Sequence, residues 1–174
     1  MLVFYLLVLR FLHVIASVAW AGGAAIFFLF IEPTAKALAP TGMQFVQHMV
    51  NKRRFAIFMV ISSTLTVLSG ALLLLKVTGG EWLAYMQTGP GLGFVLGSVA
   101  GGLVYFIGMF GVNPRAQRMA KLGAAIQAAG GPPTPVQGAE LQRLDKEMST
   151  LGLIDFVLVA LSLALMGTAR YWLF

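Results

Sequence analysis

The sequence predicts an all-α fold, an integral membrane four-helix bundle with cytoplasmic helical extensions. Of its 174 residues, 59% are hydrophobic and only 10% are charged, against about 45–50% and roughly 25% in an ordinary soluble domain. Four apolar runs also reach the roughly 20 residues with which a helix crosses ~30 Å of hydrocarbon. These observations exclude a soluble enzyme, a disordered chain and a nucleic-acid-binding module, so we expect a lipid bilayer around the chain and no nucleic-acid partner.

The four apolar runs are the expected spans of a single membrane domain over residues 1–174. They cover residues 2–31, 55–75, 91–112 and 151–173. The runs lack the alternation of apolar and polar residues that a transmembrane barrel strand requires. The first run has no basic beginning and is too long for a signal peptide, which favours a retained helix.

The connection between the third and fourth spans, residues 114–150, is predicted to be a cytoplasmic helical hairpin. Apolar residues recur there with coiled-coil spacing, first at Met119, Leu122, Ile126 and Ala129, and again at Leu141, Leu144, Met148 and Leu151. The run of glycine and proline at residues 130–135 is a strong turn signal between the two sets. The second span is likewise expected to begin early, near Thr41.

The basic residues predict the orientation of the chain. Nine of them lie between spans one and two or between spans three and four, whereas the remaining connection carries only Lys76. The positive-inside rule then places both termini on the outer side of what we expect to be a bacterial cytoplasmic membrane. The net charge of +6 is therefore mainly a signal of topology and of contact with anionic lipid.

The third span carries a strip of glycines, Gly93, Gly97 and Gly101, spaced four residues apart. Such a strip lets another helix backbone approach closely. It can serve contact within the bundle, or it can join the chain to a second copy or to a larger membrane complex. The sequence leaves both roles open.

Arg10 and His13 are ionisable residues inside a span, which makes them candidates for a functional site. They lie three residues apart on one helix face, and Trp20 follows on that face. In one interpretation Arg10 reaches the outer headgroups and His13 bonds a neighbouring helix. In the other, His13 is a metal ligand to the iron of haem b, and Arg10 pairs with the haem propionates. Proton or ion handling is a further alternative.

A second haem ligand is sought at the depth of His13. His48 is excluded, because His13 lies 18 residues from Ile31, or ~27 Å along a helix from the cytoplasmic end. Met166 on the fourth span has a matching depth, and a thioether can ligate haem iron. Arg170 lies in the same region and is a second candidate partner for propionates.

Asp155 lies just inside the cytoplasmic end of the fourth span. We expect it to form a structural ion pair with Lys52, Arg53 or Arg54. A role in relaying protons is the alternative.

The first 75 residues resemble two families of membrane proteins. Arg10-Phe11-Leu12-His13, then Ala19-Trp20-Ala21-Gly22-Gly23 and Pro33, resemble the opening of copper-resistance D (CopD-like) membrane domains. Arg54-Phe55, followed by Leu68-Ser69-Gly70, is similar to the second span of that family. The four-helix HemJ-type protoporphyrinogen oxidases open in a related way, with a histidine in the first span.

This resemblance implies a four-helix bundle that binds b-type haem or handles copper, and His13 is the position it carries over most directly. HemJ-type proteins also use a lysine within the bundle, for which Lys76, at the outer edge, is the span-adjacent candidate. The nine methionines do not form the paired clusters of a copper(I) path.

The leading hypothesis is therefore a membrane haem-b protein in electron transfer or redox chemistry. The alternatives are a non-catalytic accessory subunit of a larger membrane complex, and transport of copper or a small solute. The sequence assigns no catalytic residue and leaves open whether the chain is an enzyme.

Overall fold

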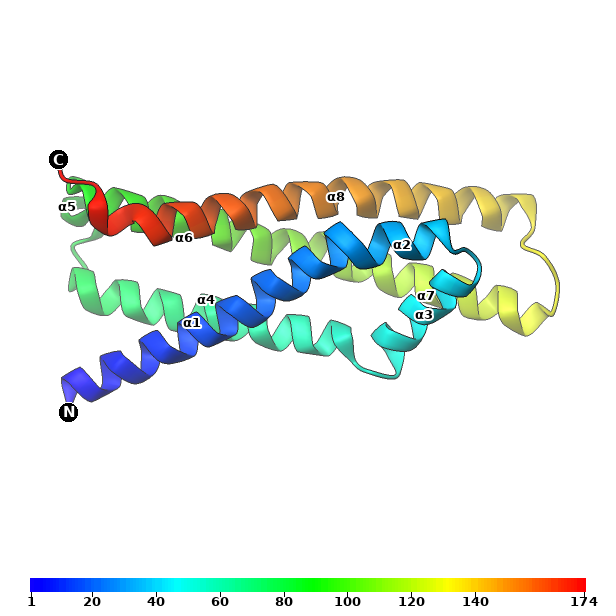
Figure 1. Cartoon of the computed structure of the whole chain (residues 1–174), viewed down its shortest axis with the longest axis horizontal. Helices are drawn as coiled ribbons and strands as arrows, with labels where there is room; N and C mark the ends of the chain where they lie inside the picture. The colour runs from blue at the N-terminus through cyan, green and yellow to red at the C-terminus, as the bar shows by residue number, and fades with distance from the viewer.

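The computed structural model describes the backbone of residues 1–174 and every side chain except that of Leu2. The regular elements of these residues are all helical, and they form an elongated bundle (Figure 1). Four helical stretches are long and apolar enough to cross a membrane: Val3–Ala37, Phe55–Thr78, Gly89–Ala129 and Pro135–Tyr171. The predicted all-α membrane fold is thereby confirmed.

Both chain termini lie at one end of the bundle, and the connection at residues 130–134 lies at the other (Figure 1). We call these the terminal end and the hairpin end. An even number of spans returns the chain to the side on which it started, so this placement agrees with the four-span prediction.

The first and third spans share a structural feature, a π-helical turn that precedes a proline. The first span runs through α1 (Leu2–Ile26), η1 (Phe27–Ile31) and α2 (Glu32–Ala37), and the third through α6 (Gly89–Phe106), η2 (Ile107–Val112) and α7 (Asn113–Ala129). Pro33 and Pro114 occupy the first turn of α2 and α7. A proline lacks an N–H and its ring crowds the carbonyl four residues earlier, so the preceding turn widens and the helix continues past each span.

The second span does not begin near Thr41, so that prediction was wrong. A separate helix, α3 (Thr41–Asn51), is followed by a turn and then by α4 (Phe55–Thr78). Arg54 adopts a left-handed backbone conformation, with φ 57°, and this redirects the chain. Gly42 lies directly against the backbone of Ala35, where a side chain would not fit, so α3 folds back on α2.

The fourth span is α8 (Pro135–Thr168), which a short helix, η3 (Ala169–Tyr171), extends. Thr134 and Gln137 form a capping box at its start, each side chain bonding the other's backbone N–H. A further short helix, α5 (Trp82–Met86), connects α4 to α6.

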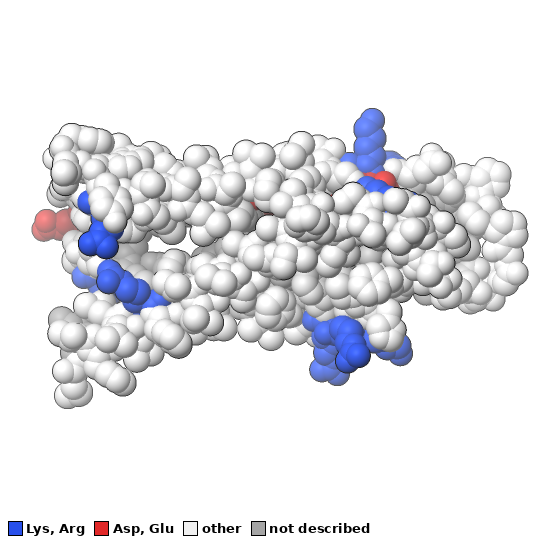
Figure 2. All heavy atoms as spheres, in the orientation of Figure 1, with Lys and Arg blue, Asp and Glu red and all other residues white. Residues whose placement is uncertain are grey.

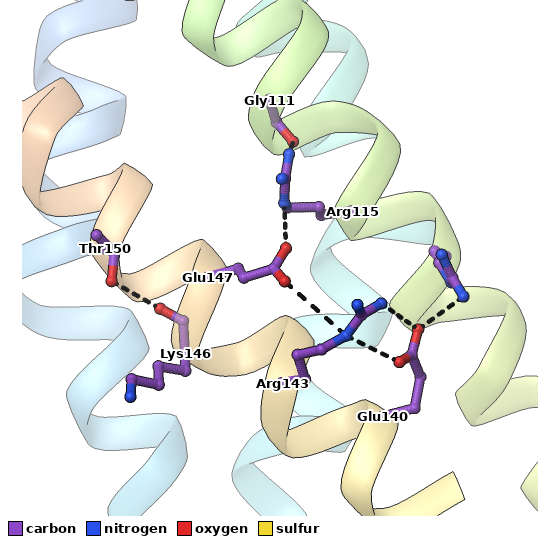
Figure 3. Close-up of polar contacts among 8 residues, drawn as sticks. Gly111, Arg115, Glu140, Arg143, Lys146, Glu147 and Thr150 are labelled. Atoms are coloured by element: carbon purple, nitrogen blue, oxygen red, sulfur yellow. Dashed lines mark hydrogen bonds and ion pairs between the residues drawn. The ribbon is translucent and has the colours of Figure 1, made fainter. Parts of the chain in front are cut away.

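The α7–α8 hairpin forms as the apolar spacing predicts. Leu144 is the most deeply buried residue of its seam, with 2% of its surface exposed. Ion pairs join the two helices beside that seam, Arg115 to Glu147 at 2.6 Å and Arg118 to Glu140 at 2.9 Å (Figure 3). Because these pairs are partly exposed, each contributes little to stability, and the seam and the turn position the hairpin.

A second ionic cluster fixes α2 to α8 near the hairpin end. Lys36 Nζ donates to Glu32 Oε1 at 2.8 Å and to Ser149 Oγ at 2.7 Å. Ser149 in turn donates to Glu32, and Asp145 lies 3.0 Å from Lys36 Nζ. This network of four side chains aligns the inner end of the first span with the fourth.

The spans associate as two helix pairs, because α1 packs mainly on α4 and α6 mainly on α8. Toward the terminal end the surface is hollowed between the two pairs (Figure 2). A small apolar core of Ala21, Val104 and Val159, with Trp20 packed against it, closes the bundle farther in. The pairs are thus joined by this core and separated by an open space beyond it.

Candidate functional site

A cavity of about 190 Å³ lies between the two helix pairs, and all four spans line it. Its lining includes His13 and Trp20 from α1, Thr66 and Gly70 from α4, Gly101 and Gly102 from α6, and Ser162 and Met166 from α8. The structure therefore brings together His13, Trp20 and Met166, which the sequence singled out on helices far apart in the chain.

A backbone carbonyl fixes the imidazole of His13. Its Nδ1 lies 2.9 Å from the carbonyl oxygen of Thr66. A carbonyl only accepts hydrogen bonds, so Nδ1 donates to it, and in the neutral imidazole Nε2 then carries the free lone pair. Nε2 has no hydrogen-bond partner among the described residues. Metal-ligating histidines are held in this way, with the second ring nitrogen donating to a carbonyl.

The hydroxyl groups of α4 behind His13 are already satisfied. Ser62, Thr66 and Ser69 are buried, and each donates to the carbonyl four residues earlier. Ser69 Oγ also lies 3.4 Å from His13 Nδ1. These contacts support the protonated face of the ring and leave no α4 hydroxyl to compete for Nε2.

Gly70 makes room for the His13 ring. A Cβ atom at this position would lie 2.8 Å from Cε1 and 3.1 Å from Nδ1 of the imidazole. No ordinary packing tolerates such a contact, so the absence of a side chain allows His13 to reach Thr66. Sequence reasoning missed this role, as it missed the Thr66 carbonyl, because neither carries a side-chain signal.

The predicted partners of propionates lie outside the cavity. Arg10 is one turn before His13, Arg170 is one turn after Met166, and both are exposed. The Arg170 guanidinium lies 5.5 Å from the centre of the Tyr171 ring. Lys76, two residues beyond the cavity-lining Leu74, is a third cation of this end. None of the three forms an ion pair with a described acidic side chain.

Basic side chains are visible beside the hollow at the terminal end (Figure 2). The cavity thus combines an apolar lining with a positively charged rim. Such a combination suits an apolar group that carries anionic substituents.

The glycine strip of the third span packs on α8 of the same chain. A Cβ atom on Gly93 would lie 2.7 Å from the Cβ of Ala169, and one on Gly97 would lie 2.6 Å from Cγ of Met166. Ser162 Oγ donates to the Gly97 carbonyl at 2.8 Å. Of the two predicted roles, contact within the bundle is therefore realised, and the strip also positions Met166.

Asp155 does not form the ion pair that we predicted with Lys52, Arg53 or Arg54. Its Oδ1 is buried without a hydrogen-bond partner among the described residues. The turn at Arg54 ends α3 and leaves the three basic side chains exposed, so they stay in solvent instead of entering the bundle.

Comparison of the chain with protein-family models, with curated proteins and with solved structures finds no match. The resemblance to CopD-like and HemJ-type proteins stays a prediction.

The donor set at the cavity limits the kind of metal that it can hold. Among the described side chains, no group of three or more His, Cys, Asp or Glu lies together. A structural zinc ion would need such a group of ligands. A single imidazole, with a thioether on the same cavity, is enough for a metal whose other ligands come from a macrocycle.

Proposed function

We propose that this chain is a membrane haem-b protein that acts in electron transfer or redox chemistry. The orientation of His13 carries this proposal. Its Nδ1 is occupied by the Thr66 carbonyl, and its unpartnered Nε2 belongs to a ring that lines an apolar membrane cavity. An intramembrane imidazole prepared in this way is suited to ligating a metal.

The residues around the cavity fit a haem held partly outside it. Gly101 and Gly102 line the cavity without side chains, which leaves more of its space open. The volume of about 190 Å³ is below the roughly 300–1,000 Å³ of sites that enclose a ligand. A haem would therefore remain partly exposed.

Each residue has a defined role in this proposal. His13 and Met166 would hold the haem iron, and Arg10 and Arg170, with Lys76, would be the partners of the propionates. When bound, the haem supplies one-electron chemistry at iron, and the protein sets its potential through ligands and burial. We place the hairpin end in the cytoplasm of a bacterial cell, because nine of the basic residues lie there.

The visible spectrum of the purified chain tests the proposal. Protein expressed with ample haem should show a Soret band, and His13→Ala should abolish it because the imidazole that would hold the iron is lost. His48→Ala is the matched control, since His48 is exposed and lies outside the cavity. Wild-type protein without a Soret band would rule out haem binding, and a His13→Ala protein that keeps the band would rule out His13 as its ligand.

The positively charged rim of the cavity leads to a second prediction, with a smaller expected effect. Arg10→Gln should weaken haem binding by about two- to fivefold, because a partly solvated ion pair contributes up to about 1 kcal/mol. The loss should shrink at high salt, which screens exposed charges. Titration of the purified apoprotein with haem measures this, with Arg53→Gln as a control cation at the other end. If Arg10→Gln and Arg53→Gln bound haem with equal affinity, Arg10 would not contribute to haem binding.

A further inference from the structure

Asp155 is a carboxyl group inside a span that the haem proposal does not use. Its Oδ1 is buried and has no hydrogen-bond partner among the described residues. Its Oδ2 faces the third span, 4.0 Å from where a Cβ on Gly108 would lie. The carboxyl thus faces helix backbone instead of a cation.

No neighbouring span supplies a counter-charge at this depth. Residues 14–31, 55–75 and 91–112 contain no Lys, Arg, His, Asp or Glu. The one tyrosine in these three stretches is Tyr105, on the third span. Its hydroxyl lies 3.3 Å from Thr64 Oγ1. Asp155 therefore has only neutral groups facing it from α1, α4 and α6.

Farther toward the hairpin end, charged groups of the first, third and fourth spans form ion pairs. On the first span these are Glu32 and Lys36, which bond each other and Ser149. On α8 and α7 they are Glu147 and Arg115, paired at 2.6 Å. Asp155 is thus separated from the ionic clusters as well as from the cavity.

Asp155 nevertheless shares a helix face with the cavity. Val159, Ser162 and Met166 line the cavity and follow Asp155 by four, seven and eleven residues, the spacing of one face of a helix. The step from Asp155 to Val159 is ~6 Å along the axis. The apolar core that contains Val159 lies between, so charge in the cavity can act on Asp155 only through its electric field and without contact.

We propose that Asp155 is a proton-exchange site beneath the cavity. An ionised carboxylate with no counter-charge is costly in a low-dielectric membrane interior, so the carboxyl holds a proton while the cavity is uncharged. Positive charge in the cavity favours the ionised form. The O–H bond then breaks and the proton passes to water at the hairpin end, and no electron moves. The exchange stands on its own, whereas its coupling to the cavity rests on the proposed haem site.

Infrared spectroscopy of the full chain in lipid nanodiscs, without haem, tests the exchange. At neutral pH the wild type should show the C=O stretch of a protonated carboxylic acid, and alkaline pH should abolish it. Asp155→Asn should lack the band, Asp155→Glu should retain it at a shifted frequency, and Glu81→Gln, which changes an exposed carboxylate, should leave it unchanged. Circular dichroism and gel filtration verify folding, and if Asp155→Asn fails to fold, the Asp155→Glu shift alone assigns the band.

A wild-type spectrum without the band at neutral pH would overturn the proposal. So would a band that persists at strongly alkaline pH, because the carboxyl would then be neutral but would not exchange its proton. A band that survives in folded Asp155→Asn, or that does not shift in folded Asp155→Glu, would assign it to another group and would equally overturn the proposal.

Addition of ferric haem, followed by its chemical reduction, tests the coupling. Where a Soret band forms, the carboxylic band should disappear at a lower pH with ferric than with ferrous haem, by about tenfold in proton concentration, because the ferric form carries one more positive charge at iron. Identical titrations of the two forms would overturn the coupling. Where no Soret band forms, the haem proposal and the coupling fail together, and the ligand-free titration still decides whether Asp155 exchanges its proton.

Discussion

Replacing Gly70 by alanine should weaken haem binding by about ten- to a hundredfold, the usual cost of disturbing a group that orients a metal ligand. The new Cβ would lie 2.8 Å from Cε1 of His13, so the ring would have to move away from α4. That movement would break the bond from Nδ1 to the Thr66 carbonyl and turn Nε2 from its present direction. Haem titration of the purified apoprotein measures the effect.

Gly22→Ala is the matched control for this experiment. Gly22 lies on α1, as His13 does, but outside the cavity lining, and a Cβ there would meet nothing within 4 Å. The control should therefore bind haem with nearly wild-type affinity. If Gly70→Ala bound haem as tightly as Gly22→Ala, the orientation of His13 by α4 would not matter for binding.

Gly97→Val should destabilise the folded chain itself, by about 3 kcal/mol, the upper range for overpacking a tight contact. The valine would meet Met166 Cγ at 2.6 Å and the Ser162 carbonyl at 3.3 Å. It would also push α8 away and cost the hydrogen bond from Ser162 to the Gly97 carbonyl. The melting temperature should fall by roughly 6–12 °C, which circular dichroism in mild detergent can follow.

This variant also tests the hypothesis of an accessory subunit. Gly102→Val, on the same helix, adds the same side chain where nothing lies within 4 Å, so it should be tolerated. If Gly97→Val left the melting temperature unchanged but dissociated a complex in native mass spectrometry, the glycine strip would serve a partner instead of α8.

Sequence periodicity located the helices but not their breaks. The seam around Leu144 and the turn at residues 130–135 predicted the α7–α8 hairpin, because a long helical pair repeats its apolar contacts regularly. The turn at Arg54 was missed, since a single residue with φ 57° has no periodic signal. The same turn explains why the predicted ion pair of Asp155 was wrong.

Some residues of the candidate site could likewise be predicted from the sequence, and others could not. His13, Trp20 and Met166 stood out because polar or ligating side chains are rare within an apolar span, and the structure places all three on one cavity. The Thr66 carbonyl and Gly70 could not be found from their types, because one acts through its backbone and the other through an absent side chain.

By itself the sequence determined that the chain suits a lipid environment, where its four spans lie, and which few side chains inside those spans can take part in chemistry. These follow from composition and from spacing along one chain, which are local properties. Only the tertiary structure decided which nitrogen of His13 is free, which helix the glycine strip serves, and that Asp155 Oδ1 has no hydrogen-bond partner among the described residues. Each of these three features depends on contacts between helices that are distant in sequence. Such contacts decide which polar groups are hydrogen-bonded, which surfaces pack closely and which charges stay unpaired.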